Sequence, residues 1–199
     1  MVRYLLPMDP VFTIPYPEFA VASQLSRHFP ASGGYAIFVP ASRQQKGVDL
    51  LVTHRAQRLT RAMSVQVKSS RTYSHERGGR FKYYTWYNNF ETPPEADFIF
   101  LIALYPSQDG DNDRTINSWW SQLVLVFSHD EMVEFLRSVK TVGGKRDKMF
   151  GFGFDSPAHI EQTRGDQHRM GLDFTSYLLG NRVGVLGEFL AHGPRVVAA

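Results

Sequence analysis

The chain contains no cysteine, so disulfide bonds and metal sites with thiolate ligands are excluded, as is common for proteins of the cytoplasm. Long apolar runs are also missing. The longest run, 98–105, is far shorter than the roughly 20 apolar residues that a helix needs to cross a bilayer. Residues 1–10 lack the apolar centre of a secretion signal. We therefore expect a cytoplasmic protein that is not embedded in a membrane.

Motifs of several enzyme classes are absent or incomplete. Gly143, Gly144 and Lys145 resemble part of a phosphate-binding loop, but the earlier glycine and the Ser or Thr after the lysine are missing. No Gly-x-Ser-x-Gly elbow of a serine hydrolase occurs. No spacing typical of metal ligands on a helix or hairpin links three of the histidines, His159, His168 and His192. The sequence thus gives no support to these three classes of site.

The overall composition is that of a folded protein. Hydrophobic residues make up 43% of the chain and charged residues 21%, which argues against disorder. A chain of 199 residues can bury a sizeable core. We predict one domain over 1–199, with a core at about 18–139 and a C-terminal extension at about 140–199.

Positive charge is concentrated in one part of the chain. Between residues 40 and 82 there are ten lysines or arginines against two acidic residues, a local charge of +8, whereas the rest of the chain carries −5. Such a region favours a polyanionic partner, because binding of phosphates releases counterions. Exposed hairpins are often charged for solubility alone, and this second interpretation stays open.

Two short runs with alternating polarity lie inside this basic region. Val48, Leu50 and Val52 alternate with other residues in the first run, and Met63, Val65 and Val67 alternate with Ser64, Gln66 and Lys68 in the second. A period of two is typical of a half-buried strand. If the two strands pair as a hairpin, Asp49, Gln66 and Lys68 are expected on one surface.

An acidic residue also falls on the apolar stripe of a predicted helix. Pro17 suits the first position of a helix over 17–29, in which Glu18 shares a stripe with Val21, Leu25 and Phe29. This placement would direct Glu18 toward the sheet. A glutamate in a first turn also complements the helix dipole, which explains Glu18 without any chemistry.

The remaining elements are predicted from their apolar runs and turn signals. Ser128 and Glu131 have the spacing of a capping box, so we assign the cluster 129–131 to the start of a helix rather than to a metal site. Tyr83, Tyr84 and Trp86 could stack on bases, although cross-strand packing is the commoner role. We expect strands at 35–39, 81–87, 98–105, 119–127 and 151–154, and helices at 17–29, 128–139, 173–179 and 181–191.

The polar face of the hairpin has the residue types that phosphodiester hydrolysis requires. Magnesium is held by hard oxygen ligands and neutralises charge on the phosphate. Asp49 is the obvious ligand, and the side-chain oxygen of Gln66 and the backbone carbonyl of Val67 can add to it. Glu18 could bind directly or through water. Lys68 could orient or deprotonate the attacking water or stabilise the phosphate.

This order of elements resembles the PD-(D/E)XK nuclease superfamily, which includes many restriction enzymes and archaeal Holliday-junction resolvases. The resemblance rests on a helix with an inward Glu, then Gly-Val-Asp-Leu-Leu-Val, then a hairpin to Val-Gln-Val-Lys-Ser-Ser, and covers about 18–70. Residues 98–105 would form the next core strand. The resemblance implies a restriction-endonuclease-like α/β fold, a mixed central sheet flanked by helices on both faces, with C-terminal additions.

The resemblance also implies roles for individual residues. It implies Asp49 as the motif's Asp, Gln66 at its (D/E) position, Lys68 as its Lys and Glu18 as the acid of the first helix. Ser70 would be an auxiliary polar residue near the phosphate. The implied activity is an endonuclease that uses Mg²⁺, with Mn²⁺ as a substitute, and DNA as its partner; a homodimer is left open. The residues expected to contact DNA are Arg43, Lys46 and Arg71.

The sequence departs from the family pattern at Gln66, where an acid is commonest. The loss of that charge should weaken metal binding. One alternative is therefore a relative that binds nucleic acid without cutting it. A second alternative is a protein-interaction domain with no polyanionic partner.

Overall fold

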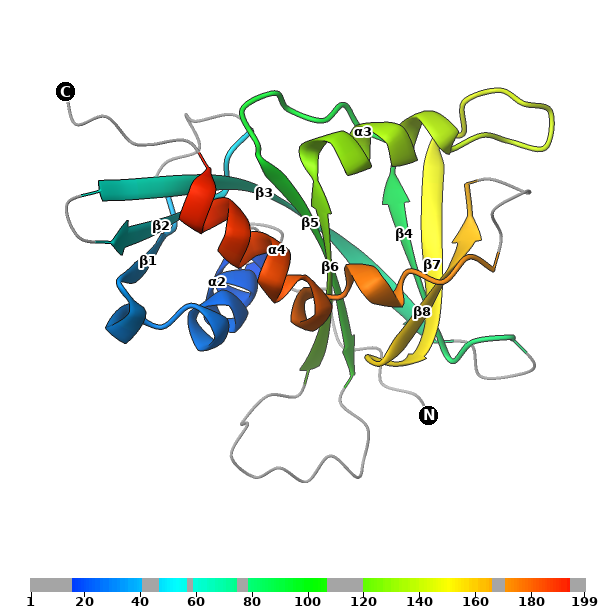
Figure 1. Cartoon of the computed structure of the whole chain (residues 1–199). Helices are drawn as coiled ribbons and strands as arrows, with labels where there is room; N and C mark the ends of the chain where they lie inside the picture. Colours follow the sequence, from blue (N-terminus) through cyan, green and yellow to red (C-terminus); the bar gives the residue numbers. More distant parts are fainter. Residues whose placement is uncertain are drawn as a thin grey trace.

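The computed structural model describes residues 16–40, 47–56, 59–74, 79–106, 120–165 and 171–193, which form a mixed α/β fold (Figure 1). In chain order the elements are α2 (Tyr16–His28), the short 3-10 helix η1 (Ala31–Gly33), β1 (Tyr35–Phe38), β2 (Leu50–Ala56), β3 (Leu59–Ser74), β4 (Tyr83–Asn88), β5 (Phe98–Pro106), β6 (Trp120–Ser128), α3 (His129–Ser138), β7 (Met149–Ser156), β8 (His159–Arg164), the short 3-10 helix η2 (Thr175–Tyr177) and α4 (Leu179–His192).

Five strands form the main sheet, in the order β1-β2-β3-β5-β6. All neighbours are antiparallel except β3 and β5, which run parallel from the pair Val65–Phe98 to the pair Arg71–Leu104. A parallel pair needs a connection that returns to the starting end of the sheet. Here the chain makes that return through β4 and the segment that follows it.

A second, smaller sheet begins at the C-terminal end of β3. Residues Thr72–Ser74 of β3 pair with β4, β4 pairs with β7, and β7 pairs with β8, all antiparallel. Figure 1 shows β3 crossing the molecule from β2 to this second sheet, in which β4, β7 and β8 stand together. The long strand β3 therefore belongs to both sheets.

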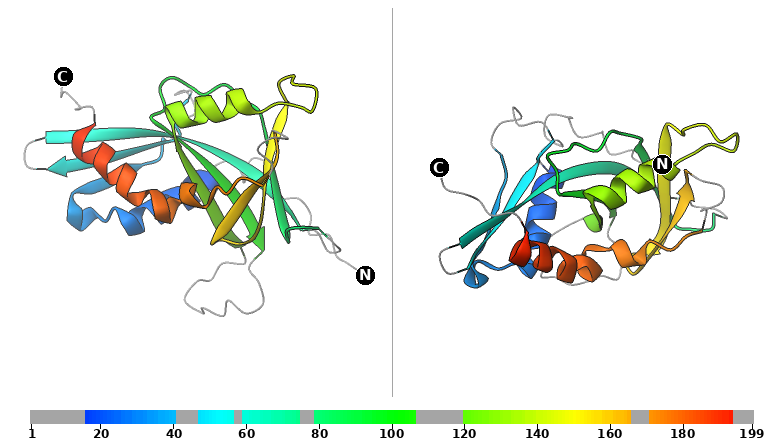
Figure 2. Two further views of the ribbon diagram at one scale, coloured as in Figure 1. Left: turned by 45° about the vertical axis from the view of Figure 1, so that its right-hand side comes forward. Right: turned by 45° about the horizontal axis from the view of Figure 1, so that its top comes forward.

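One face of the main sheet is covered by helices. Apolar residues of α2 and α4 pack on alternate residues of β2, β3, β5 and β6, and Figure 2 shows both helices on the side of the sheet opposite α3. We call this cluster the helix-side core. Its fully buried members include Val21, Leu25, Leu50, Val52, Met63, Val65, Phe100, Ile102, Val126, Leu186 and Leu190.

The other face is covered by α3 and by the second sheet. The residues of β5 and β6 that point away from the helix-side core meet aromatic residues of β4 and β7 and one face of α3. We call this cluster the aromatic core. Its buried members include Tyr83, Tyr87, Ile99, Leu101, Tyr105, Leu125, Phe127, Met132, Phe135, Phe150, Phe152, Phe154 and Phe174.

Several of the expected elements are confirmed. The predicted strand 98–105 is β5, which is buried on both faces because its residues alternate between the two cores. The predicted helices 17–29 and 128–139 are α2 and α3. The capping box is formed: the Ser128 hydroxyl accepts from the Glu131 amide at 3.3 Å, and the Glu131 carboxylate accepts from the Ser128 amide at 2.7 Å. The expected strands 35–39, 81–87 and 119–127 correspond to β1, β4 and β6.

Other expectations were wrong in extent. The helix expected over 173–179 is only the short η2, in which the Asp173 carboxylate accepts from the Thr175 amide at 2.7 Å. The final helix, α4, begins at Leu179 rather than Asn181, and β7 is twice as long as the strand expected at 151–154. The strand β8 was not predicted at all, because HIEQTR alternates only weakly.

Candidate functional site

The candidate site lies on the hairpin formed by β2 and β3. The two strands pair from Leu50–Val65 to Ala56–Leu59, and the Asp49 amide continues the ladder by donating to the Val65 carbonyl at 2.8 Å. Val65 and Val67 point into the helix-side core. Since side chains alternate along a strand, Gln66 and Lys68 point to the opposite face, the one that carries α3. The predicted hairpin and its polar face are thus confirmed.

Asp49 and Gln66 are in direct contact on this face. The Asp49 Oδ2 atom accepts a hydrogen bond from the Val67 amide at 2.7 Å and another from the Gln66 side-chain amide. The Nε2 atom of Gln66 also lies 3.5 Å from the Val67 carbonyl oxygen. Gln66 is 7% exposed, so its side chain is almost completely shielded from solvent. Three of the four predicted metal-binding residues therefore meet at one point.

These residues can offer the oxygen ligands that a hard cation prefers, but they carry less negative charge than such a cation site usually has. The partly positive Nε2 of Gln66 sits between two oxygens, the Asp49 carboxylate and the Val67 carbonyl. A half-turn of the amide would replace Nε2 by Oε1, so the side chain can also present an oxygen. Magnesium prefers oxygen ligands of this kind. Only Asp49 contributes a full negative charge, and no cluster of three His, Asp or Glu residues occurs in the described part of the chain.

Lys68 and Ser70 follow Gln66 on the same face of β3, because side chains alternate along a strand. The Lys68 ammonium lies 5.3 Å from the centre of the Phe90 ring, a cation–π contact. The Ser70 hydroxyl donates to the Trp86 carbonyl of β4. Lys68 thus lies on the same strand face as Gln66 and packs against Phe90, while the Ser70 hydrogen bond joins β3 to the second sheet.

Glu18 belongs to α2, the helix that covers the other face of the main sheet. It lies in the first turn of α2, and one of its carboxylate oxygens is shielded from solvent. The buried residues of α2, Ala20, Val21 and Leu25, belong to the helix-side core. The helix α2 therefore packs on the face opposite the one that carries Gln66 and Lys68, and the convergence of Glu18 with the other three side chains stays a prediction.

The predicted DNA contacts lie largely outside the described residues. Arg43 and Lys46 fall in the segment 41–46, and the Arg71 side chain is likewise not described, although its backbone is part of β3. Two other cations of the basic region have structural partners. Arg61 donates to the Gly193 carbonyl at the end of α4, and Arg80 pairs with Glu161 at 2.5 Å.

The segment that leads from β4 to β5 contributes residues that the sequence did not single out. Phe90 supports Lys68, and Asp97 accepts from the Ser64 amide and hydroxyl at 2.8 and 2.7 Å. Gly47 has a φ of 86°, and a Cβ atom there would lie 2.8 Å from Pro93, so only glycine fits. No short sequence motif predicts these contacts, because they form only when the segment between β4 and β5 packs against β3 and Gly47.

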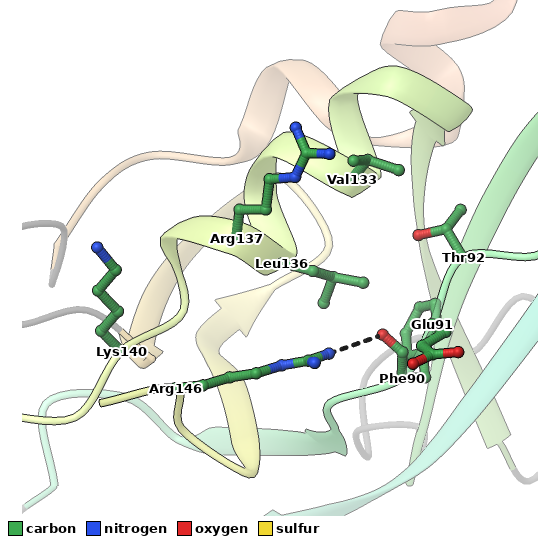
Figure 3. A pocket seen from close by; sticks show the side chains of 8 residues that line it. All are labelled: Phe90, Glu91, Thr92, Val133, Leu136, Arg137, Lys140 and Arg146. Atoms are coloured by element: carbon green, nitrogen blue, oxygen red, sulfur yellow. Dashed lines mark hydrogen bonds between the residues drawn. The ribbon is translucent and has the colours of Figure 1, made fainter. Parts of the chain in front are cut away.

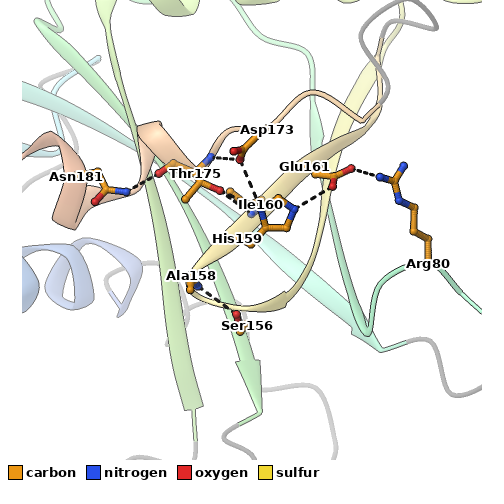
Figure 4. A network of polar contacts seen from close by, with 9 residues as sticks. All are labelled: Arg80, Ser156, Ala158, His159, Ile160, Glu161, Asp173, Thr175 and Asn181. Carbon is orange, nitrogen blue, oxygen red and sulfur yellow. Dashed lines mark hydrogen bonds and ion pairs between the residues drawn. The ribbon is translucent and has the colours of Figure 1, made fainter.

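A separate polar network joins β8 to η2 (Figure 4). His159 contacts the Glu161 carboxylate at 2.9 Å and the Thr175 hydroxyl at 3.3 Å. Glu161 also forms an ion pair with Arg80. Hydrogen bonds from the side chain and the backbone of Thr175 hold the pKa of Asp173 below its ordinary value. The network thus joins β8 to η2 and to Arg80 in the segment before β4. Of the other histidines considered above, His192 lies beside Glu188, and His168 lies outside the described residues.

The aromatic residues of β4 divide between two environments. Tyr83 is buried against Tyr105 and Phe154, as packing predicts, whereas Trp86 is 39% exposed and contacts Tyr73 with ring centres 4.9 Å apart. Tyr84 accepts a hydrogen bond from the Phe81 amide at 3.1 Å. Packing therefore accounts for Tyr83, whereas Trp86 and Tyr73 present a large aromatic surface to solvent.

Comparisons of the chain with protein-family models, with curated proteins and with solved structures gave no match. Among the described helices, none is long and apolar enough to span a membrane.

Proposed function

We propose that this protein is an endonuclease with a restriction-endonuclease-like fold that hydrolyses DNA phosphodiester bonds with Mg²⁺, for which Mn²⁺ can substitute. The observation that supports the proposal is the meeting of Asp49, the Gln66 amide and the Val67 carbonyl at one point, with Lys68 on the same strand face. An order β1-β2-β3-β5 with a parallel β3–β5 pair agrees with the mixed central sheet that the resemblance implies.

Each residue would have a distinct role. Asp49, Gln66 and Val67 would hold the cation through oxygen atoms. Bound there, Mg²⁺ supplies neutralisation of the phosphate charge and activation of a water molecule. Lys68 would donate to a phosphate oxygen or orient the attacking water, and its position over Phe90 limits its motion. The Val67 amide keeps the Asp49 carboxylate oriented toward β3.

A second candidate function is nucleic-acid binding without hydrolysis. The observation that favours it is the direct Gln66–Asp49 hydrogen bond, which occupies the carboxylate oxygen and leaves one negative charge where most family members have two. A site with a single carboxylate binds Mg²⁺ weakly. The basic region between residues 40 and 82 would be retained in either case.

Cleavage assays separate the two functions. Linear, circular and branched DNA are incubated with the protein in Mg²⁺ or Mn²⁺, next to the variants Asp49→Ala and Lys68→Ala and the control Lys148→Ala. Lys148 is an exposed residue in the segment after α3 and has no role in the proposed site. The proposal expects metal-dependent cutting that falls by about 100-fold or more in Lys68→Ala and is unchanged in the control.

The outcomes are distinguishable. Equal cutting by the wild type and both site variants would refute the proposed site. Salt-sensitive retardation of DNA with no cutting in either metal would favour the binding function. Failure to retard any nucleic acid at low salt would point instead to a protein-interaction domain.

A further inference from the structure

A pocket with an apolar floor and a cationic rim lies beside the candidate site. It has a volume of about 410 Å³ and is formed between α3, the segment after it and the β4–β5 connection (Figure 3). Pockets for small organic ligands commonly fall in the range of about 300–1,000 Å³. The lining residues are Phe90, Glu91, Thr92, Val133, Leu136, Arg137, Lys140 and Arg146.

The charges around this pocket are mainly positive. Arg137, Lys140 and Arg146 face one carboxylate, that of Glu91. Within the described residues, no carboxylate forms an ion pair with any of the three cations. The rim thus carries an excess of two positive charges that no described acidic residue neutralises.

The three cations have different structural surroundings. Arg137 lies in the last turn of α3, where a cation complements the helix dipole, and Lys140 lies just beyond the end of the helix. Arg146 pairs with Lys140 through an isolated β-bridge, and its guanidinium donates to the Asn89 side chain at 3.0 Å and to the Phe90 carbonyl at 3.4 Å. Figure 3 shows Arg146 extending toward Phe90 below Leu136. These contacts fix Arg146 beside the apolar floor.

The pocket is connected to the candidate site through Phe90. The Phe90 ring contributes to the lining of the pocket and also supports the Lys68 ammonium. A polyanion held at Lys68 would therefore pass close to the pocket rim. Arginine binds phosphate through two parallel hydrogen bonds, and aromatic rings stack on bases.

We propose that this pocket binds one nucleotide unit, with the base on the floor formed by Phe90, Val133 and Leu136 and the phosphate on Arg137, Lys140 and Arg146. The unit is either a free nucleoside monophosphate or the terminal nucleotide of a DNA strand. This binding requires neither a metal ion nor hydrolysis, so it holds whether or not the hairpin is catalytic.

Calorimetric titration without metal tests the proposal. The probes are deoxyadenosine 5′-monophosphate, deoxyadenosine, inorganic phosphate, and a short single-stranded oligonucleotide with and without a 5′-phosphate. The test variant is Arg137→Gln with Lys140→Gln, both exposed. The control, Lys145→Gln with Lys148→Gln, removes the same charge from exposed positions nearby that do not line the pocket.

Saturable binding of the monophosphate is expected, with affinity at least about tenfold above that of either deoxyadenosine or phosphate, which corresponds to about 1.4 kcal/mol. The pocket variant should lose about tenfold in affinity while the control keeps it. Preference for the 5′-phosphorylated oligonucleotide over the monophosphate assigns the DNA end as the source, and the reverse assigns the free nucleotide.

Three results would overturn the proposal: no saturable binding by the wild type, equal binding of phosphate and monophosphate, or equal losses in the pocket and control variants. The last result would show a general charge effect. None of these results bears on metal-dependent cutting at Asp49 and Lys68, so failure of this proposal is separable from failure of the nuclease proposal.

Discussion

At the scale of single residues, Gln66 decides what the hairpin can do. Its amide lies against Asp49 where a second carboxylate would complete a stronger cation site. Gln66 is also nearly buried, so any charge placed here needs a partner. The balance between metal binding and simple hydrogen bonding therefore depends on this one side chain.

Replacement of Gln66 by Glu should make stability dependent on metal. Two carboxylates in contact repel each other, so Gln66→Glu should lower the free energy of unfolding in chelator, by about 1–3 kcal/mol. Added Mn²⁺ should restore much of that loss and bind more tightly than to the wild type. Thermal unfolding with and without Mn²⁺ measures both effects.

The matched control is Gln162→Glu, since Gln162 is also buried, at 1% exposure, but lies in β8. It should be destabilised without rescue by metal. Equal rescue of both variants, or rescue of neither, would contradict a cation site at Gln66.

A second residue-scale prediction concerns Gly151 in β7. A Cβ atom there would lie 2.2 Å from the Trp86 ring and 2.8 Å from the Thr85 carbonyl. Gly151→Ala should therefore lower the free energy of unfolding by about 1–3 kcal/mol, as measured by urea denaturation. Gly187→Ala in α4, where nothing lies within 4 Å of the added carbon, should be neutral or stabilising by about 0.5–1 kcal/mol. A loss in Gly187→Ala as large as that in Gly151→Ala would show that close packing is not the cause.

Sequence alone predicted part of the site. The alternation in β3 placed Gln66 and Lys68 on one face, and the pairing with β2 brought Asp49 beside them. The helix stripe placed Glu18 inward, but a stripe does not tell which face of the sheet a helix covers. That choice is made by tertiary packing, which puts α2 on the opposite face.

At the scale of elements, the start of α3 is held by two sets of contacts. Ser128 and Glu131 form the capping box, and Glu131 also pairs with Arg182 from α4. Partial burial acts to raise the pKa of Glu131, but the hydrogen bonds from Ser128 and Arg182 outweigh it and hold the pKa below its ordinary value of 4.5. The carboxylate thus links the starts of two helices.

The pH dependence follows from this lowered pKa. A carboxyl group that binds its proton more weakly in the folded state stabilises the fold above its unfolded pKa, and this contribution is lost as pH falls below 4.5 through the folded pKa. Glu131→Gln should therefore flatten the stability curve below pH 4.5 and cost about 1 kcal/mol at neutral pH. Urea denaturation between pH 3 and 7 measures it. The exposed Glu134→Gln is the control, and the same flattening there would exclude Glu131 as the cause.

Element prediction succeeded where local signals were strong. The capping box defined the start of α3, and the continuous apolar run defined β5. It failed where tertiary contacts decide the structure. The strand β8 forms by pairing with the free edge of β7. The helix η2 ends after three residues because Phe174 and Tyr177 pack against Phe127.

At the scale of the whole molecule, the strand β5 joins the two cores. Phe98, Phe100 and Ile102 belong to the helix-side core, and Ile99, Leu101 and Ala103 belong to the aromatic core. Loss of packing on either face removes support from the same strand. The sequence predicted coverage on both faces, but not that a second sheet provides much of it.

This arrangement predicts cooperative unfolding. Phe100→Ala and Phe152→Ala, one in each core and both fully buried, should each lower the free energy of unfolding by about 3–5 kcal/mol. Fluorescence and circular dichroism should report a single coincident transition in each variant. Phe19→Ala, at a position that is 57% exposed, should change stability by less than about 0.5 kcal/mol. Two separate transitions would show that the cores unfold independently.

The most direct test of the central claim is the rate at which Asp49→Asn nicks supercoiled DNA in Mn²⁺. This change removes the only negative charge at the meeting point of Asp49, Gln66 and Val67 while keeping an oxygen that can accept from the Val67 amide. We expect the wild type and the control Glu134→Gln to nick DNA at equal, metal-dependent rates, and the rate of Asp49→Asn to fall to that measured without protein. Nicking by Asp49→Asn at the wild-type rate, or no nicking by the wild type, would contradict it.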